Sequence, residues 1–302
     1  MTTLDHNSTA VLLEAAVPEF GGRPYGLEPL VLPLRPAPGD PDLPRRDQDP
    51  SGTLGTSDSA EQLFWFRWIT GHQLTFIFWQ EIGRRADRAP DAGDVVADVR
   101  SATRLIRAYS AMLLYTASCT RDVYHRVIRP SMALHHPAFS GAWARDYGPV
   151  RALLRGRLPA SWAAVPDAAA LAHECAVNEA VHEGIAAKLV PEAPSLLQSS
   201  ANEGRALPRD VRAVLFDTYF LTLRASSTPE DVATQMLRRV RAVQDDLRVN
   251  GLYPAFAESR HEKPDTLTVS EVVEIEREMP HLLGATAGHA IARQPPQTPS
   301  AD

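Results

Sequence analysis

Apolar residues recur every three or four positions along most of the chain, which is the spacing of amphipathic helices. The first such run follows the N-cap candidates Ser57 and Ser59 and continues to about Arg88. A second helix is predicted over about 94–127, and we expect Pro130 to close it because proline disfavours helix in the residue before it. Further helices are predicted at about 145–156, 167–190, 208–225 and 228–251, and from about 270 onward.

The two ends of the chain have a different composition. Residues 1–57 are rich in Pro and Gly, as in LPLRPAPGDPDLPRRDQDPSG, so we expect an arm that cannot sit inside a sheet and is mobile at about 36–57. Residues 293–302 are predicted to be a disordered tail. No convincing run of alternating strand residues and no internal repeat is visible. The predicted fold is therefore an all-α, multi-helix bundle over 58–292.

Bulk composition mainly excludes classes of protein. An apolar content of 44% and a charged content of 23% are typical of soluble globular proteins, and the net charge of -6 argues against a nucleic-acid binder. Cys119 and Cys175 are too few for a disulfide scaffold and suit a reducing compartment. The first residues contain no basic region followed by a long apolar run. We therefore expect a cytoplasmic protein without a membrane segment.

One stretch, FWFRWITGHQLTFIFWQ at 64–80, combines three of the five tryptophans with a histidine. Helical steps of four and seven residues from His72 reach Trp65, Trp68, Phe76 and Trp79. This face has two interpretations. It can be a packed core with one satisfied histidine, or it can be the wall of a flat ligand pocket in which an imidazole that titrates near working pH exchanges a proton with the ligand.

The segment WITGHQLTFIFWQ resembles the first signature of tryptophan 2,3-dioxygenases, in which a His-Gln pair is followed by an aromatic pair and a glutamine. In that family the histidine lies on the distal side of a heme and contacts the polar group of the aromatic substrate. The resemblance implies that His72 is the catalytic residue. The position four residues earlier lines the substrate pocket in that family, which implies substrate contacts for Trp68 and, on the same face, for Phe76.

A heme also needs an axial ligand from another element. The predicted helix at 167–190 contains His173 and His182, which are about 900° apart at about 100° per residue and so face opposite sides. Both cannot bind one iron. The segment VHEGIAAKLVP loosely matches the dioxygenase pattern that begins with the axial histidine, with Lys188 as its basic residue and a proline where the family has glycine. The resemblance favours His182 over His173 as the proximal ligand.

Two further segments resemble substrate-binding parts of the dioxygenases. SLLQSSANEG follows the axial helix and implies that Ser199 and Asn202 contact the substrate, although it lacks the family's glycines. HPAFSGAWARDYGPVR is similar to the segment that supplies the arginine for the substrate carboxylate. Arg145 is the candidate that we favour there, and Arg151 is the alternative.

The overall plan most resembles the heme-dependent L-tyrosine 3-hydroxylases of actinobacterial natural-product pathways, over about 60–205. This resemblance implies conversion of L-tyrosine to L-DOPA with hydrogen peroxide, or with dioxygen and a reductant, in a domain that covers 58–292. A non-covalent heme b is expected, because neither His173 nor His182 begins the His-x-x-x-Cys pattern of a related branch and no Cys-x-x-Cys-His motif is present. We expect a homodimer, because large helical heme enzymes often associate.

The sequence also allows other functional interpretations. A di-iron bundle would use Glu-x-x-His pairs, and the chain has Glu179/His182, Glu258/His261 and Glu278/His281. A non-catalytic heme-binding sensor would bind heme without turnover. Within the heme class, a methylated tyrosine or tryptophan could replace L-tyrosine as the substrate.

Overall fold

The computed structural model describes residues 27–34, 59–88, 94–191, 207–254 and 263–292. Helices dominate these segments, so the all-α prediction is confirmed. The long ones are α2 (Ala60–Ala86), α3 (Val95–Thr116), α8 (Ala168–Leu189), α11 (Pro229–Asn250) and α12 (Ser270–Ala292). The shorter helical elements are α4 (Arg121–Val123), η2 (Tyr124–Ile128), α5 (Arg129–His135), η3 (Gly141–Trp143), α6 (Tyr147–Leu154), α7 (Ala160–Ala163), α10 (Arg209–Tyr219) and η5 (Asp265–Leu267).

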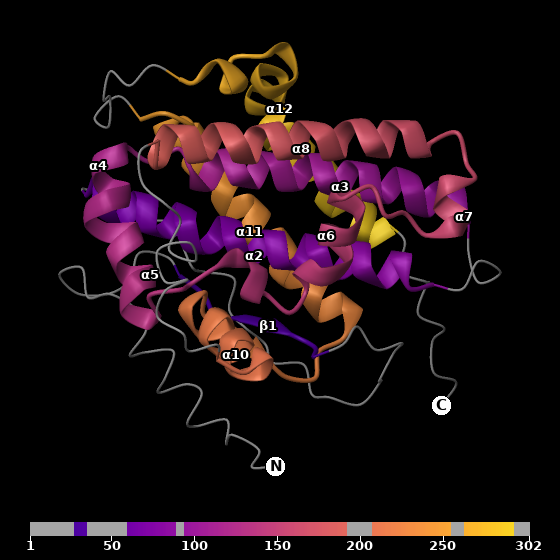
Figure 1. The fold of residues 1–302 in the computed structure, drawn as a ribbon, viewed down its shortest axis with the longest axis horizontal. Coiled ribbons are helices and arrows are strands. Elements are labelled where there is room, and N and C mark those ends of the chain that lie inside the picture. Colours follow the sequence, from indigo (N-terminus) through magenta and orange to yellow (C-terminus); the bar gives the residue numbers. More distant parts are fainter. Residues whose placement is uncertain (1–26, 35–58, 89–93, 192–206, 255–262, 293–302) are drawn as a thin grey trace, which may run out of the picture.

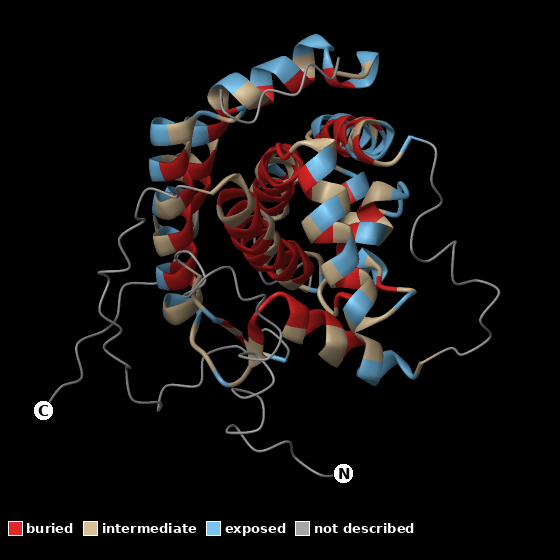
Figure 2. Ribbon diagram, turned by 90° about the vertical axis from the view of Figure 1, so that its left-hand side faces the viewer, coloured by how far each residue is buried: buried red, intermediate tan, exposed pale blue. Residues whose placement is uncertain are grey.

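Helix α2 lies at the centre of the molecule. It begins at the predicted cap, where the Ser59 hydroxyl accepts a hydrogen bond from the amide of Gln62. Helices α8, α3 and α2 cross the molecule in succession, with α10 at the lower edge (Figure 1). The central helices are buried on nearly all sides, whereas the outer ones are buried only on their inner side (Figure 2). The aromatic stretch at 64–80 therefore lies in the core.

Three close contacts fix the register of α2, α3 and α8. A Cβ on Gly71 would lie 2.4 Å from Thr116 Cγ2, so only glycine allows α2 and α3 to approach this closely. Helix α8 runs beside α3, where the buried Asn178 amide donates a hydrogen bond to Ser110 Oγ at 2.9 Å. Lys188 donates to the carbonyl oxygen of Ala117 near the end of α3, at 2.7 Å. These hydrogen bonds fix the axial register of α8 relative to α3, and with it the position of each α8 side chain along α3.

The arm contributes a strand, which the sequence analysis did not predict. Strand β1 (Leu30–Leu32) pairs in parallel with β2 (Thr222–Arg224) to form a two-stranded sheet. The expectation that the arm cannot sit inside a sheet is wrong at this point, because the apolar stretch LVL between two prolines is free to donate and accept backbone hydrogen bonds. The helix predicted at 208–225 ends at Tyr219, since the following residues pair with β1. The rest of the arm and the tail lie outside the described residues.

The predicted helix at 94–127 is also interrupted. Helix α3 ends at Thr116, and the chain then forms α4, the π-helix η2 and α5. Pro130 does not close a helix but lies in the first turn of α5, where its missing amide hydrogen costs no hydrogen bond. A π-helix is uncommon and frequently occurs at functional sites. Among the described residues, no helix is long and apolar enough to cross a membrane.

Candidate active site

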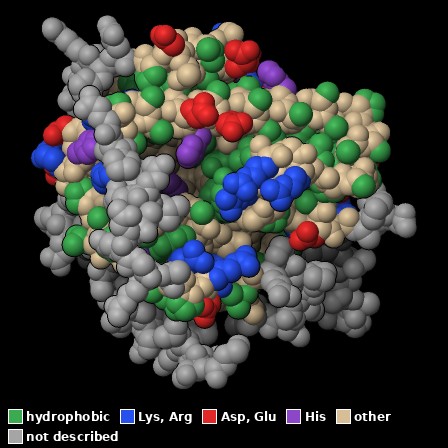
Figure 3. All heavy atoms as spheres, viewed as in Figure 1, with side chains coloured by type: hydrophobic (Ala, Val, Ile, Leu, Met, Phe, Trp, Pro, Cys, Tyr) green, Lys and Arg blue, Asp and Glu red, His purple; other side chains and the backbone are tan. Residues whose placement is uncertain are grey.

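A cavity of about 450 Å³ opens between α2, α3, α8 and the segment from η2 to η3. Its lining is mostly apolar and aromatic, and the surface view shows a hollow with hydrophobic and histidine side chains at it (Figure 3). The lining includes Trp68, His72, Trp79, Met112, Tyr124, Arg129, Ser140, His182, Leu189 and Phe220. A volume of this size is typical of pockets for small molecules and cofactors.

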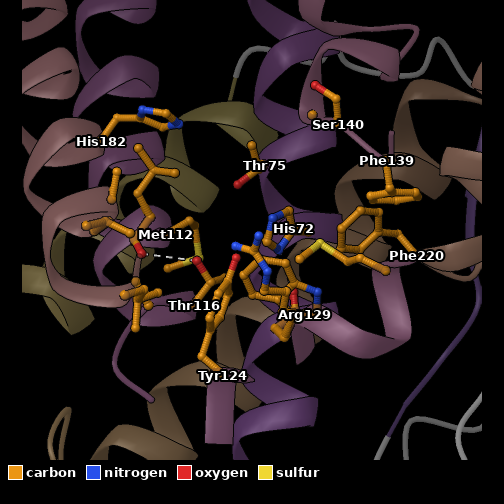
Figure 4. Close-up of a pocket in the computed structure, with 18 of the residues that line it drawn as sticks. His72, Thr75, Met112, Thr116, Tyr124, Arg129, Phe139, Ser140, His182 and Phe220 are labelled. Carbon is orange, nitrogen blue, oxygen red and sulfur yellow. Dashed lines mark hydrogen bonds between the residues drawn. The ribbon is translucent and has the colours of Figure 1, made fainter. Parts of the chain in front are cut away.

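Both histidines that the resemblance singled out line this cavity. His72 comes from α2 and His182 from α8, and the side chains lie on different walls (Figure 4). His173 is exposed and is not among the lining residues. The structure therefore brings together the two histidines that the sequence places more than 100 residues apart.

The hydrogen bonding of His72 fixes its tautomer. Its Nδ1 lies 2.6 Å from the carbonyl oxygen of Trp68, which can only accept, so Nδ1 carries the proton. The imidazole contacts two rings: that of Phe220 at 4.4 Å with an interplanar angle of 20°, and that of Trp68 at 4.3 Å with an angle of 55°. Nε2 is then the ring nitrogen that can accept a hydrogen bond from a ligand.

The charge state of His72 differs from the sequence expectation. Burial lowers its pKa to about 4, and the hydrogen bond to the carbonyl of Trp68 opposes this shift only in part. The imidazole is consequently neutral at neutral pH rather than close to its titration midpoint. Its chemistry is that of a hydrogen-bond acceptor at Nε2, with little tendency to take up a full proton.

His182 is exposed at the cavity, and surrounding protein nevertheless lowers its pKa by desolvation, while the nearby carboxylates of Glu183 and Glu179 oppose the shift. The neutral imidazole is thus favoured. Within the described segments its ring nitrogens have no hydrogen-bond partner. A neutral histidine with an uncommitted nitrogen facing an apolar cavity is able to bind a metal of borderline softness, such as iron.

The aromatic wall differs at two positions from the predicted one. Trp68 and Trp79 line the cavity, but Trp65 and Phe76 do not. Phe76 is only 1% exposed and packs behind the wall against Phe216 and Phe220. Phe220 takes the lining position. It follows α10, about 150 residues further along the chain, so helical spacing around His72 could not reveal it.

The predicted arginine also lies elsewhere. Arg145 donates to a carboxylate oxygen of Asp217 at 3.1 Å and does not line the cavity, and the alternative Arg151 is exposed on α6. Arg129, the first residue of α5, lines the cavity instead. Burial raises the pKa of the neighbouring Tyr124, and the positive charge of Arg129 partly opposes this. In the sequence Arg129 lies three residues after Arg126 and just before Pro130, and its residue type alone does not separate it from a surface arginine.

Two remaining predictions concern other parts of the chain. Ser199 and Asn202 lie in 192–206, outside the described residues.

For the di-iron hypothesis, the described segments hold no group of three or more His, Cys, Asp or Glu side chains that could bind a metal ion. In α12, Glu278 forms ion pairs with Arg107 and Arg277. The pair Glu278/His281 is thus not part of a metal-binding cluster. The pair Glu258/His261 lies outside the described residues.

A comparison with known families decides the class of protein. The family model described as SfmD 3-methyl-L-tyrosine peroxygenase matches residues 2–172. The chain belongs to this family. The match covers more than half of the chain and includes α2 with Trp68 and His72, but it ends before His182. No curated protein matches the chain. Membership in the SfmD family supports an oxidoreductase of the peroxygenase kind that acts on a tyrosine-like compound.

The low pKa of His72 predicts a pH dependence of stability. The folded pKa of about 4 lies below the ordinary value of 6.5, so the unfolded chain binds a proton first as the pH falls. The contribution of His72 to the unfolding free energy is fully present above about pH 6.5 and is lost progressively as the pH falls toward 4. We expect His72→Gln to lose less unfolding free energy than the wild type between pH 7 and pH 4.5, measured by urea denaturation.

The matched control for this experiment is His173→Gln, which changes an exposed histidine on α8 that does not line the cavity. It should keep the pH dependence of the wild type. Identical losses in the wild type and His72→Gln would show that the imidazole of His72 is not held in its neutral form.

Proposed function

We propose that this protein is a heme-dependent peroxygenase that hydroxylates a tyrosine-type amino acid on the ring carbon beside the phenol. The observation that carries the proposal is that His72 and His182, from two different helices, line one apolar cavity. Family membership supports peroxide as the oxidant and a tyrosine derivative as the substrate. The net reaction replaces a ring C–H by C–OH, while hydrogen peroxide is reduced to water.

The residues around the cavity fit a non-covalent heme b. Met112, Leu189 and the aromatic side chains offer apolar surface to a flat macrocycle, and neutral His182 offers an axial nitrogen. Cys119 and Cys175 are buried and do not line the cavity, which suits a heme held without a thioether bond. Heme bound there would supply the redox-active iron that activates peroxide.

The chain's own residues have separate tasks in this proposal. His182 would hold the heme iron through a ring nitrogen. His72 accepts a hydrogen bond from the phenol O–H at Nε2 and so orients the substrate ring and makes it more electron-rich. Trp68 and Phe220 flank His72 and provide aromatic surface for the ring. The apolar lining limits access of water to the reacting carbon.

Arg129 replaces Arg145 as the residue proposed to bind the substrate carboxylate. Arg129 lines the cavity (Figure 4), whereas Arg145 does not and pairs with Asp217 on α10. A guanidinium binds a carboxylate through two parallel hydrogen bonds, which fixes the orientation of an amino acid as well as its affinity. His72 at the phenol end and Arg129 at the carboxylate end would together select a phenolic amino acid.

Two substrates have support from different observations. The resemblance in the sequence implied conversion of L-tyrosine to L-DOPA, whereas the family is named for 3-methyl-L-tyrosine. Both present the same phenol and carboxylate and differ by one ring methyl group. The expected homodimer and the role in natural-product biosynthesis stay predictions.

The deciding experiment combines heme binding with turnover. Protein reconstituted with hemin should show a Soret band that shifts on titration with L-tyrosine or 3-methyl-L-tyrosine. With hydrogen peroxide, the preferred substrate should gain one oxygen atom, detected by mass spectrometry. Heme binding without turnover of either compound would instead support a sensor, and bound iron without a Soret band would support the di-iron reading.

His72→Ala should keep the Soret band and lose most of the turnover, because the phenol loses its hydrogen-bond acceptor. We expect a fall in kcat of at least about tenfold, the usual size of one lost hydrogen bond at a buried site. The measurement is steady-state turnover with peroxide. A variant with wild-type kcat would rule out a distal role for His72.

The axial assignment rests on His182, and His173 on the same helix is the natural control. His182→Ala should lose the Soret position typical of a histidine-bound heme, whereas His173→Ala should keep it, because His173 does not line the cavity. The absorption spectra of the two reconstituted variants test this directly. If only His173→Ala changed the spectrum, the assignment would be reversed.

Arg129→Leu tests the carboxylate contact. Loss of a charged hydrogen bond should weaken the binding of L-tyrosine by roughly 10- to 100-fold, while tyramine, which lacks the carboxylate, should bind the variant and the wild type equally. Soret titrations give both dissociation constants. Arg126→Leu is the control, since Arg126 is exposed and pairs with Asp122. Weakened heme binding with an unchanged ratio of L-tyrosine to tyramine affinity would assign Arg129 to a heme carboxylate.

A further inference from the structure

A hydrogen-bond chain outside the cavity begins at Trp68. The indole Nε1 lies 3.1 Å from the hydroxyl oxygen of Tyr219, which lies 2.8 Å from Ser131 Oγ. Ser131 Oγ lies 2.7 Å from the carbonyl oxygen of Ile128. The chain thus runs from α2 through the last residue of α10 to α5 and the end of the π-helix η2.

The direction of every bond in this chain is fixed. The indole can only donate, and the carbonyl of Ile128 can only accept. Ser131 therefore gives its single proton to Ile128 and accepts from Tyr219, which in turn accepts from Trp68. Burial raises the pKa of Tyr219, so its hydroxyl keeps the proton that the chain requires. Neither the Tyr219 nor the Ser131 hydroxyl can rotate without breaking a hydrogen bond of this chain.

The residues that follow Tyr219 place a second ring against His72. The next residue, Phe220, is the ring that stacks on the imidazole, and Leu221 then adopts a φ of 51°, in the left-handed region that leucine rarely occupies. Strained backbone of this kind persists only where surrounding contacts hold it, and it is concentrated at functional sites. The carbonyl of Leu221 accepts a hydrogen bond from the amide of Leu30 at 2.9 Å, which ties the turn to β1.

We propose that Tyr219 is a positioning residue for the active site. Its hydroxyl holds the indole of Trp68 against His72, while the strained turn that follows places the ring of Phe220 against the same imidazole. Tyr219 is 1% exposed and does not line the cavity, so it acts through Trp68 and not by touching a ligand. Tyr219 would thereby affect the binding of phenolic ligands whose O–H donates a hydrogen bond to His72. This step rests on the proposed function.

The first test needs neither heme nor substrate. In the 302-residue chain, ring NMR signals of His72, assigned by their loss in His72→Gln, report on the packing of Trp68 against the imidazole. Tyr219→Phe keeps the ring and removes the hydroxyl, so these signals should shift. Tyr115→Phe is the matched control, because it removes a buried tyrosine hydroxyl that donates to Asp246 at 2.6 Å away from the cavity. Unchanged His72 signals in Tyr219→Phe would overturn the proposal.

The second test uses protein reconstituted with heme. Tyr219→Phe should raise the dissociation constant of L-tyrosine by about tenfold relative to Tyr115→Phe while heme affinity stays the same. Ser131→Ala, which removes the next member of the chain, should act in the same direction and serves if Tyr219→Phe unfolds. Equal tyrosine binding in all variants would overturn the positioning role. Failure of the wild type to bind heme would refute the proposed function, whereas the NMR result would still decide the position of His72.

Discussion

The burial of α2 on nearly all sides is the constraint on which the rest of the structure depends. A polar side chain inside a core has to find its partner within the protein, because an unsatisfied buried group costs more than a hydrogen bond returns. Arg67 pairs with Asp246 of α11 at 2.8 Å, and Gln73 accepts from Arg239 of the same helix at 2.8 Å. The amide of Gln73 also donates to the carbonyl of Phe220 at 3.0 Å. The polar residues of α2 thus fix the places of α11 and of the turn after α10.

His72 satisfies the same constraint in a different way. Its Nδ1 donates within its own helix, to the carbonyl of Trp68, and leaves Nε2 available for a ligand. Arg67 and Gln73 use their hydrogen bonds on neighbouring elements, whereas His72 keeps one nitrogen uncommitted. The cost is the low pKa, because an imidazole with one bond in an apolar site does not hold a charge.

Features set by helical periodicity could be predicted from the sequence, and features set by contacts between distant segments could not. The face of Trp68 and His72 follows from steps of four residues, and the separation of His173 from His182 follows from the angle per residue. Arg129 reaches the cavity through a π-helix, whose longer turn shifts the phase of every later side chain. Arg145 matched a motif but lies beside Asp217, an acceptor 72 residues further along the chain.

The helices that carry the two histidines are set against α3 by residues that do not line the cavity, and this separates the placement of these helices from the choice of substrate. Gly71 sets the approach of α2 to α3, and Asn178 sets the register of α8 on α3. Trp68 and Arg129 line the cavity, whereas Gly71 and Asn178 do not. A change of the lining can therefore alter which ring substituent fits while α2 and α8 keep their places, so preference between L-tyrosine and a methylated tyrosine is expected to depend on the lining.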